Sequence, residues 1–125
     1  MNGPYAYRNR REGHRVYLRT EIAFKEPRGG SHGAALGNLG PGGIFIHAPA
    51  PYGAGTRLAL RFKLLISGEP RSIAAQGEVA WIRRTGDDRL PGFGVRFTEM
   101  AGDDARAIDR LLARRRAVSL SLGVA

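Results

Sequence analysis

A chain of 125 residues, 42% of them hydrophobic, is long enough for one compact domain with a modest core. It has no cysteine, which excludes disulfide bonds and thiolate metal sites, and no apolar stretch as long as the roughly 18 residues of a membrane span. The formal net charge is +9, nearly all of it from arginine because Lys25 and Lys63 are the only lysines, and this favours an anionic partner.

The first residues are polar or small, so we expect segment 1–9 to be flexible. The segment also lacks the apolar stretch of a secretion signal, and we therefore expect a cytoplasmic protein. A basic cluster follows, formed by Arg8, Arg10, Arg11 and Arg15, with His14 beside the last. From Val16 to Phe24 apolar and polar residues alternate, which predicts a half-buried strand.

Residues 27–33 read PRGGSHG and predict a loop, followed by a short, weak strand over 34–36. Residues 37–43 read GNLGPGG, with one asparagine, Asn38, among the glycines, and residues 44–47 predict the next strand. Glycine is favoured where a backbone turns sharply or where another group must come close. The glycine-rich stretch is therefore either a plain turn between strands or the seat of a ligand.

The second half of the chain predicts further strands separated by turns. Leu58 to Leu64 alternate between apolar and other residues, and Phe93, Val95 and Phe97 mark a last strand. Between them, after an SGEP turn, a strand over 73–83 places four residues on one side: Ile73, Ala75, Val79 and Trp81. About six short strands joined by turns favour a mainly β fold, a small closed barrel rather than an open sheet.

One helix is predicted near the C-terminus. Asp103 and Asp104 suit its N-terminal end, and the basic run Arg114 to Arg116 suits its C-terminal end. Apolar residues at helical spacing should pack it onto the barrel: Ala105, Ile108, Leu111 and Leu112. We thus expect a domain over residues 10–116 and a tail over 117–125 that is frayed or adds an edge contact.

The sequence shows no pattern of catalytic or metal-binding residues. His14, His32 and His47 have no second ligand at metal-binding spacing, and Ser31 beside His32 has no third member of a triad. The acidic residues form no recognisable pair, and neither GPGG nor GFG continues as a nucleotide-binding loop would. We therefore expect a protein that is not an enzyme and that has neither a metal nor a cofactor.

The chain resembles the PilZ domain family, whose members carry RxxxR followed by (D/N)xSxxG. Arg11 and Arg15 form the first motif, and residues 38–43 read NxGxxG, with Gly40 in place of the serine. Residues 55–56 before the LxLxF strand, GEVAW at 77–81 and GFGVRF at 92–97 support the likeness, which covers roughly Arg10 to Leu112.

The resemblance implies a six-stranded antiparallel barrel with a C-terminal helix, and binding of the bacterial second messenger cyclic di-GMP, often as a stacked dimer. Carried over by position, Arg11 and Arg15 would grip phosphates and stack on guanine, with Arg10 as a helper. Asn38 would bond a guanine edge, and Gly43 would leave room for the ligand. Gly40 departs from the motif, since it removes the hydroxyl of the family's serine.

Three functions remain open. The first is a cyclic di-GMP effector whose surface changes on binding and regulates a protein partner in motility, exopolysaccharide production or related signalling. The second, motivated by Gly40, is an adaptor with weakened or lost nucleotide binding. The third is a basic barrel that binds RNA or single-stranded DNA through exposed aromatics, for which Tyr5, Tyr7, Tyr17 and Tyr52 are the candidates. On the helix, Arg106, Arg110 and Arg114 form either a partner surface or a solvated face.

Overall fold

The computed structural model describes residues 18–26, 32–50, 52–84 and 90–121, and of His32 and residues 116–121 only the backbone. The strands are β1 (Leu18–Lys25), β2 (His32–Gly40), β3 (Gly43–Ile46), β4 (Arg57–Ile66), β5 (Glu69–Arg83) and β6 (Gly92–Met100), followed by the helix α1 (Gly102–Ser121). The flexible segment 1–9, the basic cluster and the start of the first strand at Val16 lie outside the described residues.

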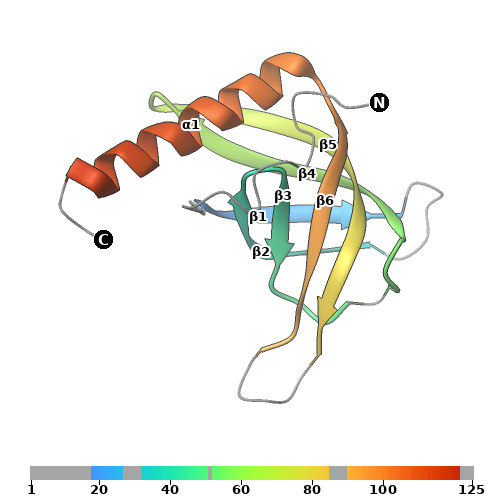
Figure 1. Cartoon of the computed structure of the whole chain (residues 1–125). Helices are drawn as coiled ribbons and strands as arrows, with labels where there is room; N and C mark the ends of the chain where they lie inside the picture. The colour runs from blue at the N-terminus through green and yellow to red at the C-terminus, as the bar shows by residue number, and fades with distance from the viewer. Residues whose placement is uncertain (1–17, 27–31, 51, 85–89, 122–125) are drawn as a thin grey trace.

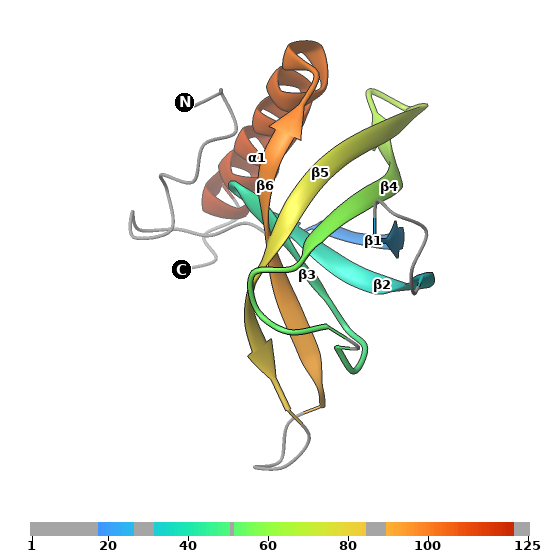
Figure 2. The same ribbon diagram turned by 90° about the vertical axis from the view of Figure 1, so that its right-hand side faces the viewer.

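The six strands form a closed antiparallel barrel in the order β1-β2-β3-β6-β5-β4, and pairing between β1 and β4 completes the ring. The predicted mainly β fold and the closed barrel are confirmed. Figure 1 shows α1 lying across one end of the barrel, and Figure 2 shows the long, twisted strand β5 running the length of the molecule. In the described part of the chain, no helix is long and apolar enough to cross a membrane.

The core fills the barrel because each strand alternates inward apolar residues with outward ones. In β4, for example, Leu58, Leu60, Phe62 and Leu64 are all at most 3% exposed. Tyr52 is also buried, edge-on to Phe24 and Phe93, so its expected role as an exposed aromatic is wrong. The ring thus belongs to the core rather than to the outer surface.

The glycine-rich stretch is mostly strand, which corrects the predicted turn over 37–43. β2 continues to Gly40, and only Pro41 and Gly42 lie in the turn, with Gly42 at φ 80°. Proline followed by a glycine with positive φ is typical of a tight type II turn. The weak strand expected over 34–36 is therefore nine residues long, because its backbone pairs with β1 and β3 although its small and polar residues give a weak pattern.

Strand β5 contains a β-bulge that reverses its alternation. Val79 pairs with Val95, but Trp81 pairs with the adjacent Gly94, so one extra residue, Ala80, is left between them. A bulge moves every later side chain to the opposite face. Ile73, Ala75 and Val79 are buried as predicted, whereas Trp81 is 46% exposed, so its predicted inward position is wrong.

The helix packs onto the barrel through the predicted residues. Ile108 and Leu112 are 5% and 6% exposed, and Leu111 packs against the same core. Asp103 and Asp104 lie within the first turn, where negative charge complements the helix dipole, but the residue before the helix is Ala101. The helix continues to Ser121. The predicted position of Arg114 to Arg116 at its C-terminal end is therefore wrong.

Candidate functional site

Asn38 lies in the middle of a row of paired residues that crosses the outer surface of the barrel. It pairs with Arg19 of β1 on one side and with Phe45 of β3 on the other. The row continues from Phe45 to Gly94 of β6, and from Gly94 to Trp81 of β5. Because Leu39, Ile44 and Ile46 point into the core, their neighbours Asn38, Phe45 and His47 point outward.

Two aromatic rings lie flat on the backbone of β6 between their own strands. A Cβ on Gly94 would come within 2.4 Å of the Trp81 indole nitrogen, and one on Gly92 within 2.1 Å of the Phe45 ring. Only glycine at these positions allows the rings to lie so close. Phe45 and Trp81 stack with their centroids 5.1 Å apart and an interplanar angle of 23°.

Polar groups surround the two rings. The Arg83 guanidinium lies 4.8 Å from the Phe45 centroid, and the His47 ring meets Phe45 edge-on at 4.9 Å. The Nδ2 of Asn38 lies 2.9 Å from Nε2 of His47. We call these five residues the outer aromatic cluster: Asn38, Phe45, His47, Trp81 and Arg83.

The contact with His47 fixes which atom of Asn38 is available to a ligand. An amide nitrogen can only donate a hydrogen bond, so Nε2 of His47 accepts and the ring proton is on Nδ1. Burial lowers the pKa of His47 below its ordinary value of 6.5, and the guanidinium groups of Arg19 and Arg83 lower it further. The imidazole is therefore neutral near pH 7. Among the described residues, no donor reaches Oδ1 of Asn38, which stays available as an acceptor.

The outer aromatic cluster thus offers an exposed flat ring, a guanidinium beside it and a free carbonyl oxygen. These groups suit a planar heterocycle that carries N–H donors and stands close to negative charge. Within the described ranges no group of acidic or histidine residues could hold a metal ion. The chemistry supported here is binding.

The structure places three of the six predicted site residues. Asn38 is half-buried in β2, and Gly40 and Gly43 pair with each other across the turn. A Cβ at position 43 would lie 2.5 Å from the carbonyl oxygen of Val95. The pairing of β3 with β6 therefore requires glycine here, whether or not a ligand binds. That Gly43 also leaves room for a ligand stays a prediction. Arg10, Arg11 and Arg15 lie outside the described residues.

The remaining members of the cluster were not predicted. Alternation in GIFI could have indicated that Phe45 and His47 point outward, since Ile44 and Ile46 point inward. Trp81 could not have been found in this way because the bulge at Ala80 precedes it. A larger hollow of about 830 Å³ lies mainly over β1, β4 and β5, where Ala23, Ala59 and Ala74 are among its lining residues, and Asn38, Gly40 and Gly43 do not line it.

Comparison with protein families matches residues 9–114 to the PilZ domain. The chain belongs to the PilZ domain family. The match spans the whole barrel and most of α1, and it agrees with the motifs at Asn38 and Gly43. PilZ domains are binding domains rather than enzymes.

Two solved PilZ structures are similar to this fold. The inhibitor of motility MotI/DgrA of Bacillus subtilis has a TM-score of 0.74 and 20% identity, over 86% of this chain and 52% of that one. The PilZ domain of CeSA from a cellulose-synthesizing bacterium has a TM-score of 0.52 and 14% identity, over 82% of this chain and 98% of that one. This chain spans about half the length of the Bacillus protein. No curated protein sequence matches.

Proposed function

We propose that this PilZ domain is a cyclic di-GMP-binding effector that regulates a protein partner. The observation that carries the proposal is the outer aromatic cluster, which surrounds the motif residue Asn38 with groups that suit a guanine base. Guanine offers N–H donors on its Watson–Crick edge, and Oδ1 of Asn38 is an acceptor without a donor among the described residues. Trp81 and Phe45 supply an exposed stacking surface on the same face.

In this proposal the basic N-terminal segment provides the phosphate ligands. Arg11 and Arg15 would grip the phosphates of cyclic di-GMP and stack on guanine, with Arg10 as a helper, because guanidinium groups bond phosphate oxygens in a bidentate manner. A stacked dimer of the ligand would place bases on both the arginines and the cluster. Movement of this segment onto the barrel would change the surface that a partner meets. The regulated process in this proposal is motility, exopolysaccharide production or related signalling.

Calorimetric titration of the purified protein with cyclic di-GMP tests the site. We expect binding, with linear di-GMP and GMP much weaker, and we expect Arg11→Ala and Arg15→Ala each to abolish the heat. Trp81→Ala should weaken binding by about fivefold to a hundredfold, because stacking on one base is worth about 1–3 kcal/mol. Arg57→Ala, an exposed arginine on β4, is the matched control and should bind normally. Unchanged heats for the two N-terminal variants would remove the proposed site.

Trp81 gives a second, independent readout because it is the chain's single tryptophan. A base stacked on its exposed face should change its fluorescence during the same titration. Single-stranded DNA and RNA serve as competitors. If they displaced cyclic di-GMP and bound with steep salt dependence, the surface would be a nucleic-acid site instead.

The alternative function is an adaptor that has lost the nucleotide, and the observation in its favour is Gly40. A missing hydroxyl hydrogen bond costs about 0.5–1.5 kcal/mol, which weakens binding by a few-fold to about tenfold. Gly40→Ser should therefore tighten cyclic di-GMP binding by that factor. If the native protein does not bind cyclic di-GMP even at high concentration, the adaptor function is favoured, and restored binding in Gly40→Ser would assign the loss to Gly40. Tight binding by the native protein would remove the adaptor function.

A further inference from the structure

A second charged surface lies between α1 and the turn that joins β4 to β5. There, a hollow of about 270 Å³ is lined from the barrel by Ile66, Ser67 and Arg71, and from the helix by Asp103, Arg106, Ala107, Arg110, Leu111 and Arg114. We call it the helix groove. It is separate from the outer aromatic cluster, since the two share no residue.

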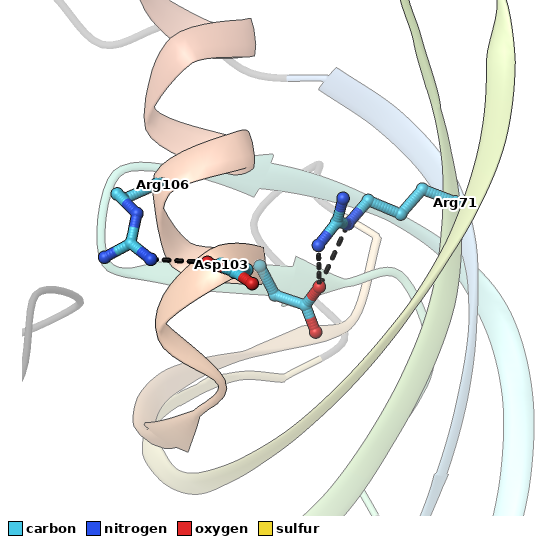
Figure 3. A network of polar contacts seen from close by, with 4 residues as sticks. Arg71, Asp103 and Arg106 are labelled. Atoms are coloured by element: carbon cyan, nitrogen blue, oxygen red, sulfur yellow. Dashed lines mark hydrogen bonds and ion pairs between the residues drawn. The ribbon is translucent and has the colours of Figure 1, made fainter.

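Ion pairs hold the two walls of the helix groove in place. Arg71 of β5 donates from Nε and Nη2 to one oxygen of Asp104, at 3.0 and 2.8 Å, and so ties the hairpin to the first turn of α1. Arg106 pairs with Asp103 one turn along the helix. Figure 3 shows both arginines directed at these carboxylates. Each of the two acids is therefore already used by one arginine.

Arg110 and Arg114 are left without a counter-charge. Both are exposed, and neither forms an ion pair or hydrogen bond with any residue that the structure describes. They stand four positions apart on the helix, so their side chains are neighbours on one face and repel each other. The groove therefore carries two unneutralised positive charges beside one another.

The floor of the helix groove is apolar. Leu111 and Ile66 are only partly buried against the core, and Ala107 also lines the groove. The sugar–phosphate backbone that would pair with the arginines has no aliphatic side chain for such a floor, whereas a protein segment can place an aliphatic side chain there and carboxylates beside it. The chain's own N-terminal segment does not suit the charge, since residues 1–17 contain four arginines and one glutamate.

We propose that the helix groove docks an acidic segment of a partner protein, with an apolar side chain set against Leu111 and carboxylates paired to Arg110 and Arg114. This inference goes beyond the proposed nucleotide binding and does not depend on it. Charge complementarity gives the docking its orientation, and the apolar floor distinguishes it from a general attraction to anions.

Fluorescence anisotropy without any nucleotide tests the proposal. The probe is a labelled amphipathic helical peptide with a leucine stripe flanked by glutamates, and its control has glutamines in place of the glutamates. We expect the glutamate peptide to bind and the glutamine peptide not to. Charge reversal by Arg110→Glu with Arg114→Glu should weaken binding about tenfold or more, because two attractive contacts become repulsive.

The matched control reverses two exposed arginines of β4, Arg57→Glu with Arg61→Glu, which changes the net charge equally. Binding by this variant should stay within about twofold of the native protein. Leu111→Ala should weaken binding of the glutamate peptide but leave binding of a labelled single-stranded DNA unchanged. Equal losses in both charge-reversal variants, no binding of the glutamate peptide, or tighter binding of DNA through Arg110 and Arg114 would each overturn the proposal.

Discussion

At the scale of single residues, the fold changes the protonation of His47. Its folded pKa lies below 6.5 because of burial and the nearby Arg19 and Arg83. Below about pH 6.5 the unfolded chain therefore binds a proton that the folded chain resists, and the free energy of unfolding falls. Above that pH, His47 does not change the free energy of unfolding further.

The variant His47→Gln keeps a polar side chain but cannot titrate, so it should lose less stability between pH 7.5 and 5.5 than the native protein does. Urea denaturation of both proteins at the two pH values measures the difference. The substitution is the only difference between the two proteins, which leaves His47 as the source of any divergence. Parallel losses would contradict the assigned pKa direction.

The glycines of β5 and β6 predict a graded series of alanine variants. Gly77→Ala places a Cβ 2.4 Å from Val95 and 2.9 Å from a backbone oxygen inside the barrel, and such overpacking costs about 1–3 kcal/mol. Gly94→Ala meets the exposed Trp81 ring, which can swing away, so about 0.5–1.5 kcal/mol of stacking is lost. Gly53→Ala, with nothing within 4 Å, should stay within about 0.5 kcal/mol.

Denaturant unfolding ranks the three glycine variants, and fluorescence of Trp81 distinguishes their mechanism. Gly94→Ala should shift the emission of the native state, whereas Gly53→Ala should not. A Gly94→Ala protein with native fluorescence and full stability would show that the indole does not lie on β6 as described.

At the scale of secondary structure, sequence patterns correctly predicted the strands whose apolar and polar residues alternate strongly. The prediction failed where a glycine weakens that alternation or a bulge residue reverses it. β4 and β6 were predicted because the inward positions within 58–64 and 93–97 are all Leu, Phe or Val. β2 was predicted too short because Gly37 and Gly40 give no apolar signal, although their backbones pair fully. Nothing in the residue types around Ala80 marks the bulge, so the outward position of Trp81 could not be predicted.

The candidate site divides in the same way. Asn38 was found by its motif spacing, but its hydrogen bond to His47 joins residues from β2 and from the end of β3 that only the hairpin register brings together. The stacking of Phe45 on Trp81 depends on β6 lying between their strands, which is a property of the barrel order. Motif residues can be predicted from the sequence, whereas the residues that contact them from other strands can be found only from the fold.

The attachment of α1 to the barrel predicts a large effect for one helix residue. Leu112 is 6% exposed in the core, so Leu112→Ala should lower the free energy of unfolding by about 2–5 kcal/mol. Leu65→Ala, at a position that is 68% exposed, is the matched control and should change it by less than about 0.5 kcal/mol. Urea titration followed by circular dichroism measures both. Equal stabilities would mean that the helix is not part of the core.

At the scale of the whole molecule, one hydrophobic core links two surfaces of different chemistry. The outer aromatic cluster lies over β2, β3, β6 and β5, and the helix groove lies between α1 and the β4–β5 turn. Strand β5 contributes to both surfaces, Trp81 to the first and Arg71 to the second. The two proposals, nucleotide binding and partner docking, therefore concern separate surfaces of the same chain.

A single core also predicts cooperative unfolding. Ala105, Ile108 and Leu112 of the helix belong to the same cluster as the residues inside the barrel, so helix and barrel should unfold together. Far-UV circular dichroism follows α1, the helix of the described chain, and fluorescence follows Trp81 in the barrel; the two urea transitions should coincide. Cyclic di-GMP at about a hundred times its dissociation constant should then raise the free energy of unfolding by about 2.7 kcal/mol in both signals. A transition of the helix that precedes that of Trp81, or a ligand effect seen by one signal alone, would mean that the helix is held more loosely than its buried residues require.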